Sequence, residues 1–290
     1  MKKTALATTL VSLFSLSSIA MAADAPASPH TFTANVGGVS DYLFRGVSQT
    51  HGKAALQGGV DYSHQSGIYL GAWGSTITWV KDWVGKGSTE IDLYGGYKSS
   101  FAGGDWNYDI GVISYNYPGK GSAIPTYLAN PNTTEIYGAI GYKWLTVKYS
   151  HAISKNFIGW YGGTGLNEDT RGSGYLELNA AYDLGDGWGL TGHIGHQKVK
   201  RSVTIPGVPT YEDANYSDWK IGITKDVGFG TVGLAYSDTD AKGNCSNPLP
   251  TSGNVSVYCW GTNSVPVTGP SANFRDVAKG QLVLSFLKTF

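Results

Sequence analysis

The chain has 290 residues, of which only 14% are charged, and its acidic and basic side chains balance to a formal net charge of zero. Soluble globular domains usually have about a quarter of their residues charged. A charge-poor chain with 41 glycines and 19 tyrosines therefore favours a barrel that faces lipid outside and water inside. The zero net charge argues against nucleic acid or an acidic substrate as a partner.

Residues 1–22 have the pattern of a secretory signal peptide. Lys2 and Lys3 precede an apolar stretch, and a small-x-small pattern predicts cleavage after Ala22. The apolar part is too short for the about 20 residues of a membrane-spanning helix. We therefore expect an exported protein with one domain, residues 23–290, that has no helical membrane span.

Period-two alternation of polar and apolar residues predicts β-strands of about ten residues. Residues 90–98 are the clearest case, with Glu90 and Asp92 on one face and Ile91 and Leu93 on the other. Alternation by itself would also fit a soluble sandwich. The pattern predicts strands at about 31–45, 53–64, 67–78, 88–101, 105–117, 133–144, 145–153, 173–184, 188–198, 215–227, 229–239 and 279–290.

The connections between these segments alternate between tight turns and longer loops, and the last loop runs from about 239 to 278. Outer-membrane barrels have short turns on the periplasmic side and longer loops outside. The sequence therefore predicts an all-β fold. We expect a transmembrane antiparallel β-barrel of about 12 strands, with short periplasmic turns and longer extracellular loops.

Aromatic residues recur at the predicted strand ends, where an interfacial girdle would lie. The expected girdle residues are Tyr42, Phe44, Tyr115, Tyr117, Trp144 and Trp188. The last predicted strand ends at Phe290. An apolar terminal strand is an exposed edge unless it pairs with another strand, so we expect it to close against the first one.

The stretch from Asp41 to Thr50 is Asp-Tyr-Leu-Phe-Arg-Gly-Val-Ser-Gln-Thr. It resembles the opening motif of a family of proteobacterial outer-membrane proteins, the TorF-type or Gcw_chp proteins, which are regarded as porins. The likeness extends over most of the mature chain, and it implies an outer-membrane barrel without an assigned substrate. In outer-membrane proteins generally, a terminal aromatic such as Phe290 is part of the signal that the barrel assembly machinery recognises.

Cys245 and Cys259 are the two cysteines of the chain, and both lie in one polar segment. In an oxidising compartment we expect them to form a disulfide. No histidine or second cysteine pair lies nearby in the sequence, which disfavours a zinc site. The sequence also has no Walker loop, dinucleotide fingerprint or HExxH motif, so we expect no cofactor and no metal.

If the alternation is correct, the polar face of each strand lines the lumen. The candidate pore-lining residues are Asn35, Asp41, Arg45, Asp61, Glu90, Asp92, Lys98, Asp109, Glu135, Lys143, Lys148, Glu177, Asp183, Asp218 and Lys220. Rings of charge set ion preference, and the excess of acids suggests a mild preference for cations. The same charges would equally serve as structural struts that pair across the lumen.

Arg45 has two interpretations. It either points inward as a constriction cation paired with Asp41, or it ends its strand and extends to the lipid headgroups.

Hydrolytic catalysis needs a nucleophile beside a base and an orienting group. The local candidates are His151 with Ser154 and Asn156, and His193 with His196. The stretch from Tyr149 to Ser154 lacks the His-x-Ser-Asn-Gly arrangement associated with the outer-membrane phospholipase. We therefore expect no enzyme.

Barrel size limits the function. About eight strands enclose a lumen filled by side chains, while about sixteen leave an aqueous channel. Twelve strands lie between, so we predict a passive diffusion channel for small hydrophilic solutes, embedded in outer-membrane lipid. The alternative is a non-conducting binding or structural barrel that acts through loops 155–172, 198–215 and 239–278. A lipid-modifying enzyme is the third hypothesis.

Overall fold

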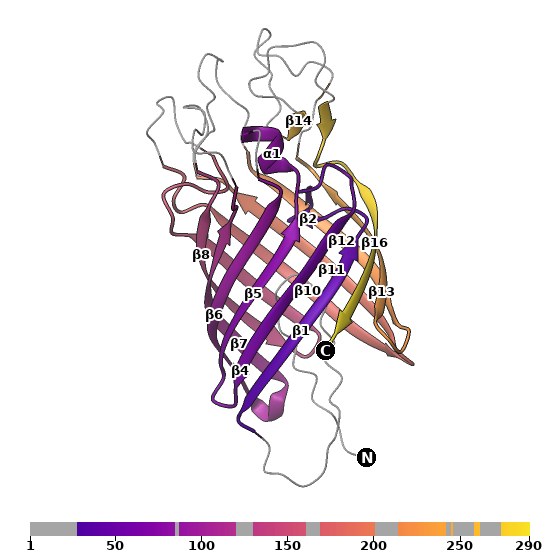
Figure 1. Ribbon diagram of the computed structural model, residues 1–290. Coiled ribbons are helices and arrows are strands. Elements are labelled where there is room, and N and C mark those ends of the chain that lie inside the picture. Colours follow the sequence, from indigo (N-terminus) through magenta and orange to yellow (C-terminus); the bar gives the residue numbers. More distant parts are fainter. Residues whose placement is uncertain are drawn as a thin grey trace.

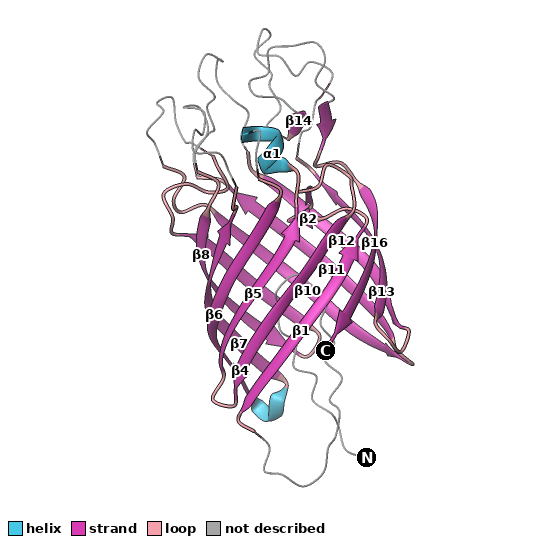
Figure 2. Cartoon of the chain, viewed as in Figure 1, coloured by secondary structure: helices cyan, strands magenta, loops and turns pink. Residues whose placement is uncertain are grey.

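A closed antiparallel barrel dominates the computed structural model (Figure 1, Figure 2). The structure describes residues 28–84, 87–119, 130–160, 169–200, 214–241, 245, 258–261 and 274–290, so the predicted signal peptide lies outside the described residues. The barrel strands are β1 (His30–Val39), β4 (Ala55–His64), β5 (Ile68–Thr76), β6 (Thr89–Phe101), β7 (Trp106–Asn116), β8 (Thr133–Tyr142), β9 (Leu145–Ala152), β10 (Gly174–Gly185), β11 (Trp188–Lys198), β12 (Tyr216–Asp226), β13 (Thr231–Thr239) and β16 (Gln281–Thr289). The prediction of about twelve barrel strands is confirmed.

Alternation along each strand separates the two faces of the barrel wall, because successive side chains point to opposite sides. On β6, Leu93 is exposed outward, whereas Glu90 and Asp92 are buried inside. Ile110 on β7 and Ile194 on β11 are likewise exposed on the outer face. The outer face is therefore apolar and the enclosed face polar.

Tight turns and long connections lie at opposite ends of the barrel, which we call the turn end and the loop end. The predicted tight turns β4–β5, β6–β7, β8–β9, β10–β11 and β12–β13 are all confirmed, and the β6–β7 turn contains the short helix η1 (Ala102–Gly104). In the β10–β11 turn, Asp186 and Gly187 have φ of 51° and 76°. Two-residue hairpin turns with positive φ at both positions match the right-handed twist of the paired strands.

The end of the chain closes the barrel. The Phe290 N–H donates to the Ala34 carbonyl at 2.8 Å, and the Ala34 N–H donates to the Phe290 carbonyl at 3.2 Å. β16 pairs with both β1 and β13, so no free edge remains between them. The predicted closure against the first strand is confirmed.

The first predicted strand is too long. β1 ends at Val39 instead of residue 45, and residues 40–54 leave the barrel wall. Two short strands, β2 (Leu43–Phe44) and β3 (Val47–Ser48), form a separate hairpin within this segment. The alternation in fact breaks after Val39, where residues 40 and 41 are both polar and residues 42–44 are all apolar, so the prediction extended the strand too far.

The girdle prediction is correct for part of its residues only. Trp144 and Trp188 are exposed on the outer face beside turns, as predicted. In contrast, Tyr42, Tyr115 and Tyr117 are buried in the hydrophobic core, with Phe44 packed against it. These aromatics lie on the inward side at the loop end, so the prediction of a girdle there was wrong.

Short elements cover the loop end: α1 (Trp79–Val84), β14 (Cys259–Gly261) and β15 (Phe274–Asp276). The predicted disulfide is present, since Cys245 is bonded to Cys259 with Cα atoms 5.4 Å apart. Among the described residues, no helix has the length and apolar character needed to cross a bilayer.

Candidate functional site: the barrel lumen

Residues 40–54, which we call the inserted segment, enter the lumen at the loop end. The ring of Tyr42 lies 5.5 Å from the ring of Trp73 on β5. Arg45 Nη1 donates to Oε1 of Gln197, on β11, at 2.8 Å. Because β5 and β11 lie on opposite sides of the closed barrel, one short segment reaches both only by crossing the interior.

The tip of the inserted segment is a tight hairpin turn that requires glycine. Arg45 and Gly46 have φ of 50° and 79°. This combination favours glycine at the second position. A Cβ at Gly46 would also lie 2.6 Å from Cγ2 of Thr239 and 2.8 Å from Cβ of Asp218. Gly46 therefore allows both the turn and its close approach to the wall.

We expect Gly46→Ala to lower the free energy of unfolding by about 2 kcal/mol or more, because left-handed φ and overpacking each cost about 1 kcal/mol or more. Denaturant unfolding in detergent measures the loss. Gly228→Ala is the matched control, since Gly228 has φ of 88° but no atom within 4 Å of the new Cβ. Equal losses in the two variants would contradict the close approach at Gly46.

Arg45 anchors the hairpin to the far wall. Its Nη1 and Nη2 lie 3.1 Å and 2.7 Å from the two carboxylate oxygens of Glu135, which form a bidentate ion pair. The side chains of Arg45 and Glu135 are only 7% and 1% exposed. The Arg45 guanidinium carbon also lies 4.4 Å from the ring centroid of Tyr175. The headgroup interpretation of Arg45 is therefore wrong, and its inward partner is Glu135 instead of Asp41.

Asp41 ties the two ends of the inserted segment together. Its Oδ1 accepts hydrogen bonds from Oγ of Ser48 at 2.6 Å and from Oγ1 of Thr50 at 2.7 Å. The same Thr50 Oγ1 accepts the backbone N–H of Tyr42 at 3.0 Å. Short polar side chains that bond to nearby residues stabilise compact loops in this way. The polar residues of the family-like stretch thus shape the inserted segment.

The last long connection covers the inserted segment from the loop end. Ser48 N–H donates to the Val277 carbonyl at 2.8 Å, and Val277 N–H donates to the Tyr258 carbonyl at 3.1 Å. Arg275 Nη1 donates to the His51 carbonyl at 3.0 Å. The inserted segment is consequently held between the barrel wall and this cover.

A band of paired polar side chains lines the middle of the lumen on β9 to β12. Lys148 Nζ lies 3.9 Å from Oε1 of Glu177. The His193 ring bonds to Oδ1 of Asn179 at 2.7 Å and to Oδ2 of Asp218 at 3.0 Å. Asn179 Nδ2 donates to Oε2 of Glu177 at 2.8 Å, so these contacts form one continuous network across four strands.

Tyrosines extend the polar band over β4 to β8. Tyr69 Oη donates to Oδ1 of Asp109 at 2.6 Å and is also hydrogen-bonded to Tyr137 Oη. Tyr94 Oη donates to Oδ1 of Asp61 at 2.5 Å. The acids of the band are thus held by hydroxyl donors as well as by cations, which supports their role as struts.

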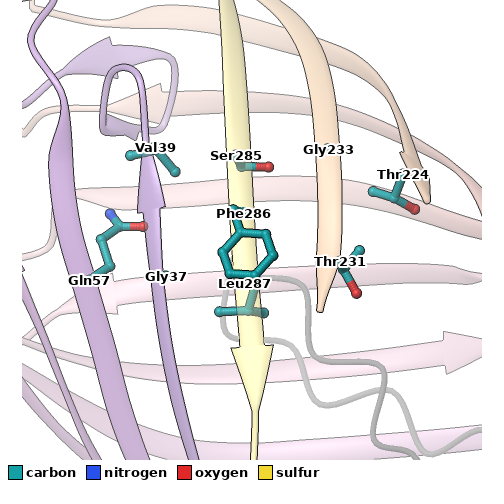
Figure 3. A pocket seen from close by; sticks show the side chains of 9 residues that line it. All are labelled: Gly37, Val39, Gln57, Thr224, Thr231, Gly233, Ser285, Phe286 and Leu287. Carbon is teal, nitrogen blue, oxygen red and sulfur yellow. The ribbon is translucent and has the colours of Figure 1, made fainter. Parts of the chain in front are cut away.

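The opposite wall of the lumen is uncharged. Its inward positions on β1, β13 and β16 are Thr31, Thr33, Asn35, Gly37, Val39, Thr231, Gly233, Ala235, Ser237, Thr239, Gln281, Val283, Ser285, Leu287 and Thr289. A pocket lies along this wall and extends to Gln57 of β4 and Thr224 of β12 (Figure 3). Gly37 and Gly233 line this pocket, and both are closely packed, because a Cβ at Gly37 would overlap the Phe286 carbonyl oxygen and one at Gly233 would overlap Ser285 Oγ.

Most predicted lumen residues occupy inward strand positions: Asn35, Asp61, Glu90, Asp92, Lys98, Asp109, Glu135, Lys148, Glu177, Asp218 and Lys220. Asp41 and Arg45 lie in the inserted segment instead of on a barrel strand. Lys143 lies in the β8–β9 turn with φ of 54°, and its Nζ is 3.9 Å from Oδ2 of Asp105. Asp183 is exposed beside the β10–β11 turn, where its Oδ1 accepts the Gly185 N–H. Lys143 and Asp183 are therefore corrected to the turn end.

Sequence reasoning missed the inward tyrosines, because tyrosine was counted with the apolar face. Tyr69, Tyr94 and Tyr137 each place a hydroxyl beside an acid or another hydroxyl. The available signal was their position, since each lies an even number of residues from a polar inward residue on its own strand.

The residues considered for catalysis are not arranged as a hydrolase site. Ser154 Oγ donates to the Asn156 carbonyl at 2.9 Å, while His151 Nδ1 lies 3.3 Å from Tyr149 Oη. In the described part of the chain no contact joins Ser154 to His151. The enzyme hypothesis gains no support from this geometry.

The comparisons with known proteins concern a family and several solved barrels. Residues 23–259 match the family model described as "Bacterial protein of unknown function (Gcw_chp)". This agrees with the resemblance of the stretch at Asp41, while the TorF-type name stays a prediction. No curated protein matches the chain.

Three of the similar solved structures are named porins or channels. They are the KdgM porin (6% identity, TM-score 0.48, 89% of this chain and 99% of that chain), the NanC porin (10%, 0.46, 89% and 98%) and the COG4313 outer membrane channel from Pseudomonas putida F1 (10%, 0.43, 92% and 97%). Because all three TM-scores are below 0.5, we draw no functional conclusion from these similarities.

Proposed function

This chain belongs to the Gcw_chp family of bacterial proteins, and we propose that it is an outer-membrane channel through which small hydrophilic solutes diffuse passively. The observation that carries the proposal is the closed barrel with an apolar outer face and a charged interior. Closure gives every strand two neighbours, so the backbone N–H and C=O groups of the wall are hydrogen-bonded although a bilayer offers them no water. The apolar outer face contacts the acyl chains favourably.

The orientation follows from the lengths of the connections. The turn end lies in the periplasm and the loop end faces the outside, as in other outer-membrane barrels. The signal peptide of residues 1–22 directs export, and Phe290 contributes to recognition by the barrel assembly machinery. In this orientation the inserted segment narrows the outer mouth of the channel.

The solute path lies between the polar band and the uncharged wall. This wall has no charged side chain at its inward positions on β1, β13 and β16. Solutes that pass there meet charged groups on one side only. The inserted segment supplies the constriction, because its hairpin crosses the lumen at the loop end.

The charges inside the barrel favour cations. Seven inward acids stand on the strands: Asp61, Glu90, Asp92, Asp109, Glu135, Glu177 and Asp218. The inward bases of the strands and the inserted segment are Arg45, Lys98, Lys148 and Lys220. Excess negative charge along a pore raises the local concentration of cations.

We expect single-channel currents from the purified full chain in planar bilayers. Under a potassium chloride gradient, the reversal potential should have the sign of a cation-selective pore. Migration on gels with and without heating verifies that the protein used is folded. A folded barrel that gives no current over many insertions would overturn the channel proposal, and a current selective for anions would overturn the expected charge preference.

A second function is favoured by the inserted segment. The inserted segment is bonded to the barrel wall and to Val277, and Val277 is bonded to Tyr258. These ordered contacts fill the outer mouth. A barrel sealed in this way would act as a binding or structural protein through its loops. Absence of current from the wild type, together with current from variants that release the inserted segment, would support this alternative.

A further inference from the structure

Two carboxylates of β6 lie buried beside the inserted segment. Glu90 is 1% exposed and Asp92 is 4% exposed. Glu90 Oε1 accepts a long hydrogen bond of 3.4 Å from Tyr42 Oη. Within the described residues, Glu90 Oε2 and Asp92 Oδ1 are buried and have no hydrogen-bond partner. Buried polar atoms are rarely left in this condition, so each one calls for an explanation.

The described cations do not neutralise this pair. Arg45 is bound by both oxygens of Glu135. Asp92 also interacts electrostatically with Glu90 and Glu135, which adds repulsion between like charges. An unpaired charge taken out of water costs several kcal/mol. Glu90 and Asp92 therefore require a compensating positive charge, which is either a proton or a bound cation.

The surroundings of the pair are aromatic. The strand register places Trp73 and Tyr115 on either side of Asp92. Tyr42 lies against Trp73 and bonds to Glu90. Aromatic rings attract cations through their quadrupole, and they hold organic ammonium ions in particular. Among the residues that the structure describes, no group of three or more histidine, cysteine, aspartate or glutamate side chains could hold a metal ion.

We propose that Glu90 and Asp92, together with Tyr42, Trp73 and Tyr115, bind a small organic ammonium ion. This inference rests on the proposed channel function and names a class of cationic solute for it. A divalent metal would need more oxygen ligands than this pair supplies. The carboxylates neutralise the ammonium charge, and the aromatic side chains replace part of its hydration shell. Because the inserted segment lies beside the site, exchange of the cation requires that segment to move.

Calorimetric titration of the full chain in detergent tests the site, with methylammonium chloride as the probe at constant ionic strength. Methanol serves as the uncharged comparison, and we expect it not to bind. Glu90→Gln and Asp92→Asn should each weaken methylammonium binding about tenfold, which corresponds to about 1.4 kcal/mol. The double variant should abolish binding. Asp105→Asn removes an exposed turn-end acid and should leave the affinity within twofold.

A shared proton is the alternative to a bound cation, and titration at pH 6 and pH 9 separates the two. The ionisable groups that interact with the pair are Tyr42, Tyr94, Tyr115, Tyr117 and Glu135, and Arg45 in turn interacts with Tyr115 and Glu135. A cation site should bind methylammonium at both pH values, and more tightly at pH 9, where protons compete less. Absence of binding at both pH values in folded wild-type protein would leave a shared proton only and would overturn the proposal. Unchanged affinity in the folded double variant would also overturn it.

The outcomes for the site and for the channel are distinguishable. Calorimetry does not require an open pore, so methylammonium binding without any bilayer current would reject the channel and keep the site. Current without methylammonium binding would keep the channel and reject the site. Heat-modifiable migration identifies variants that fail to fold. Where a variant fails to fold, the titration of the wild type alone decides whether the methylammonium site exists.

Discussion

Arg45→Ala is expected to lower the free energy of unfolding by about 3–5 kcal/mol, because it leaves the buried Glu135 carboxylate without its partner. The substitution also removes the bond to Gln197, which holds the hairpin tip at the far wall. The inserted segment should then leave its position more often, and the single-channel conductance should rise. Denaturant unfolding and planar-bilayer recording measure the two effects on the same protein.

A paired substitution separates the charge from the anchor. Arg45→Met with Glu135→Gln removes both buried charges while it keeps similar volumes. We expect most of the stability to return, since neutral replacement of a buried ion pair costs little. The conductance should stay above that of the wild type, because the bidentate anchor is still missing. A loss below about 1 kcal/mol for Arg45→Ala would instead match an exposed ion pair and contradict the buried anchor.

The barrel wall was predictable because its signal is local. The segment predicted at 88–101 is β6, Thr89–Phe101, and the segment predicted at 188–198 is β11, Trp188–Lys198. A strand with one face toward lipid and one toward a polar lumen must alternate residue by residue. Closure at Phe290 was also predictable, since an apolar strand without a partner is unfavourable.

The inserted segment was not predictable because its determinants are not local. The alternation is lost after Val39, since residues 40 and 41 are both polar and residues 42–44 are all apolar, but this break does not show that the chain turns inward. What ends the strand is a turn with positive φ at Arg45 and Gly46, together with an ion pair to Glu135, 90 residues away in the sequence. No pattern within a ten-residue window contains that partner.

The site at Glu90 and Asp92 was likewise predictable only in part. Glu90 and Asp92 were predicted to face the lumen, because their strand alternates clearly. Their burial was not predictable, since it depends on Tyr42, which the sequence placed in a lipid-facing girdle. Once residues 40–54 turn inward, the aromatic side chains at the loop end move from the expected headgroup region to the interior.

Ile221→Arg on the outer face is expected to lower the free energy of unfolding in lipid by about 2–4 kcal/mol. Ile221 lies in the middle of β12 (Tyr216–Asp226) and is 54% exposed. In a bilayer, an arginine at that depth must be taken out of water, whereas isoleucine favours the acyl chains. Reversible unfolding from lipid vesicles measures the difference.

Ser217→Arg is the depth control, because Ser217 lies on the same strand near the loop end. An arginine at the interface should cost about 0–1 kcal/mol, since its guanidinium reaches the headgroups.

The sign of the Ile221→Arg effect also decides whether the outer face of the barrel meets lipid or water. If the exposed outer face met water, arginine would replace an apolar side chain at little cost or with a gain in stability. Equal and small effects at both positions would therefore place the barrel outside a membrane, and the proposed channel would be wrong with it.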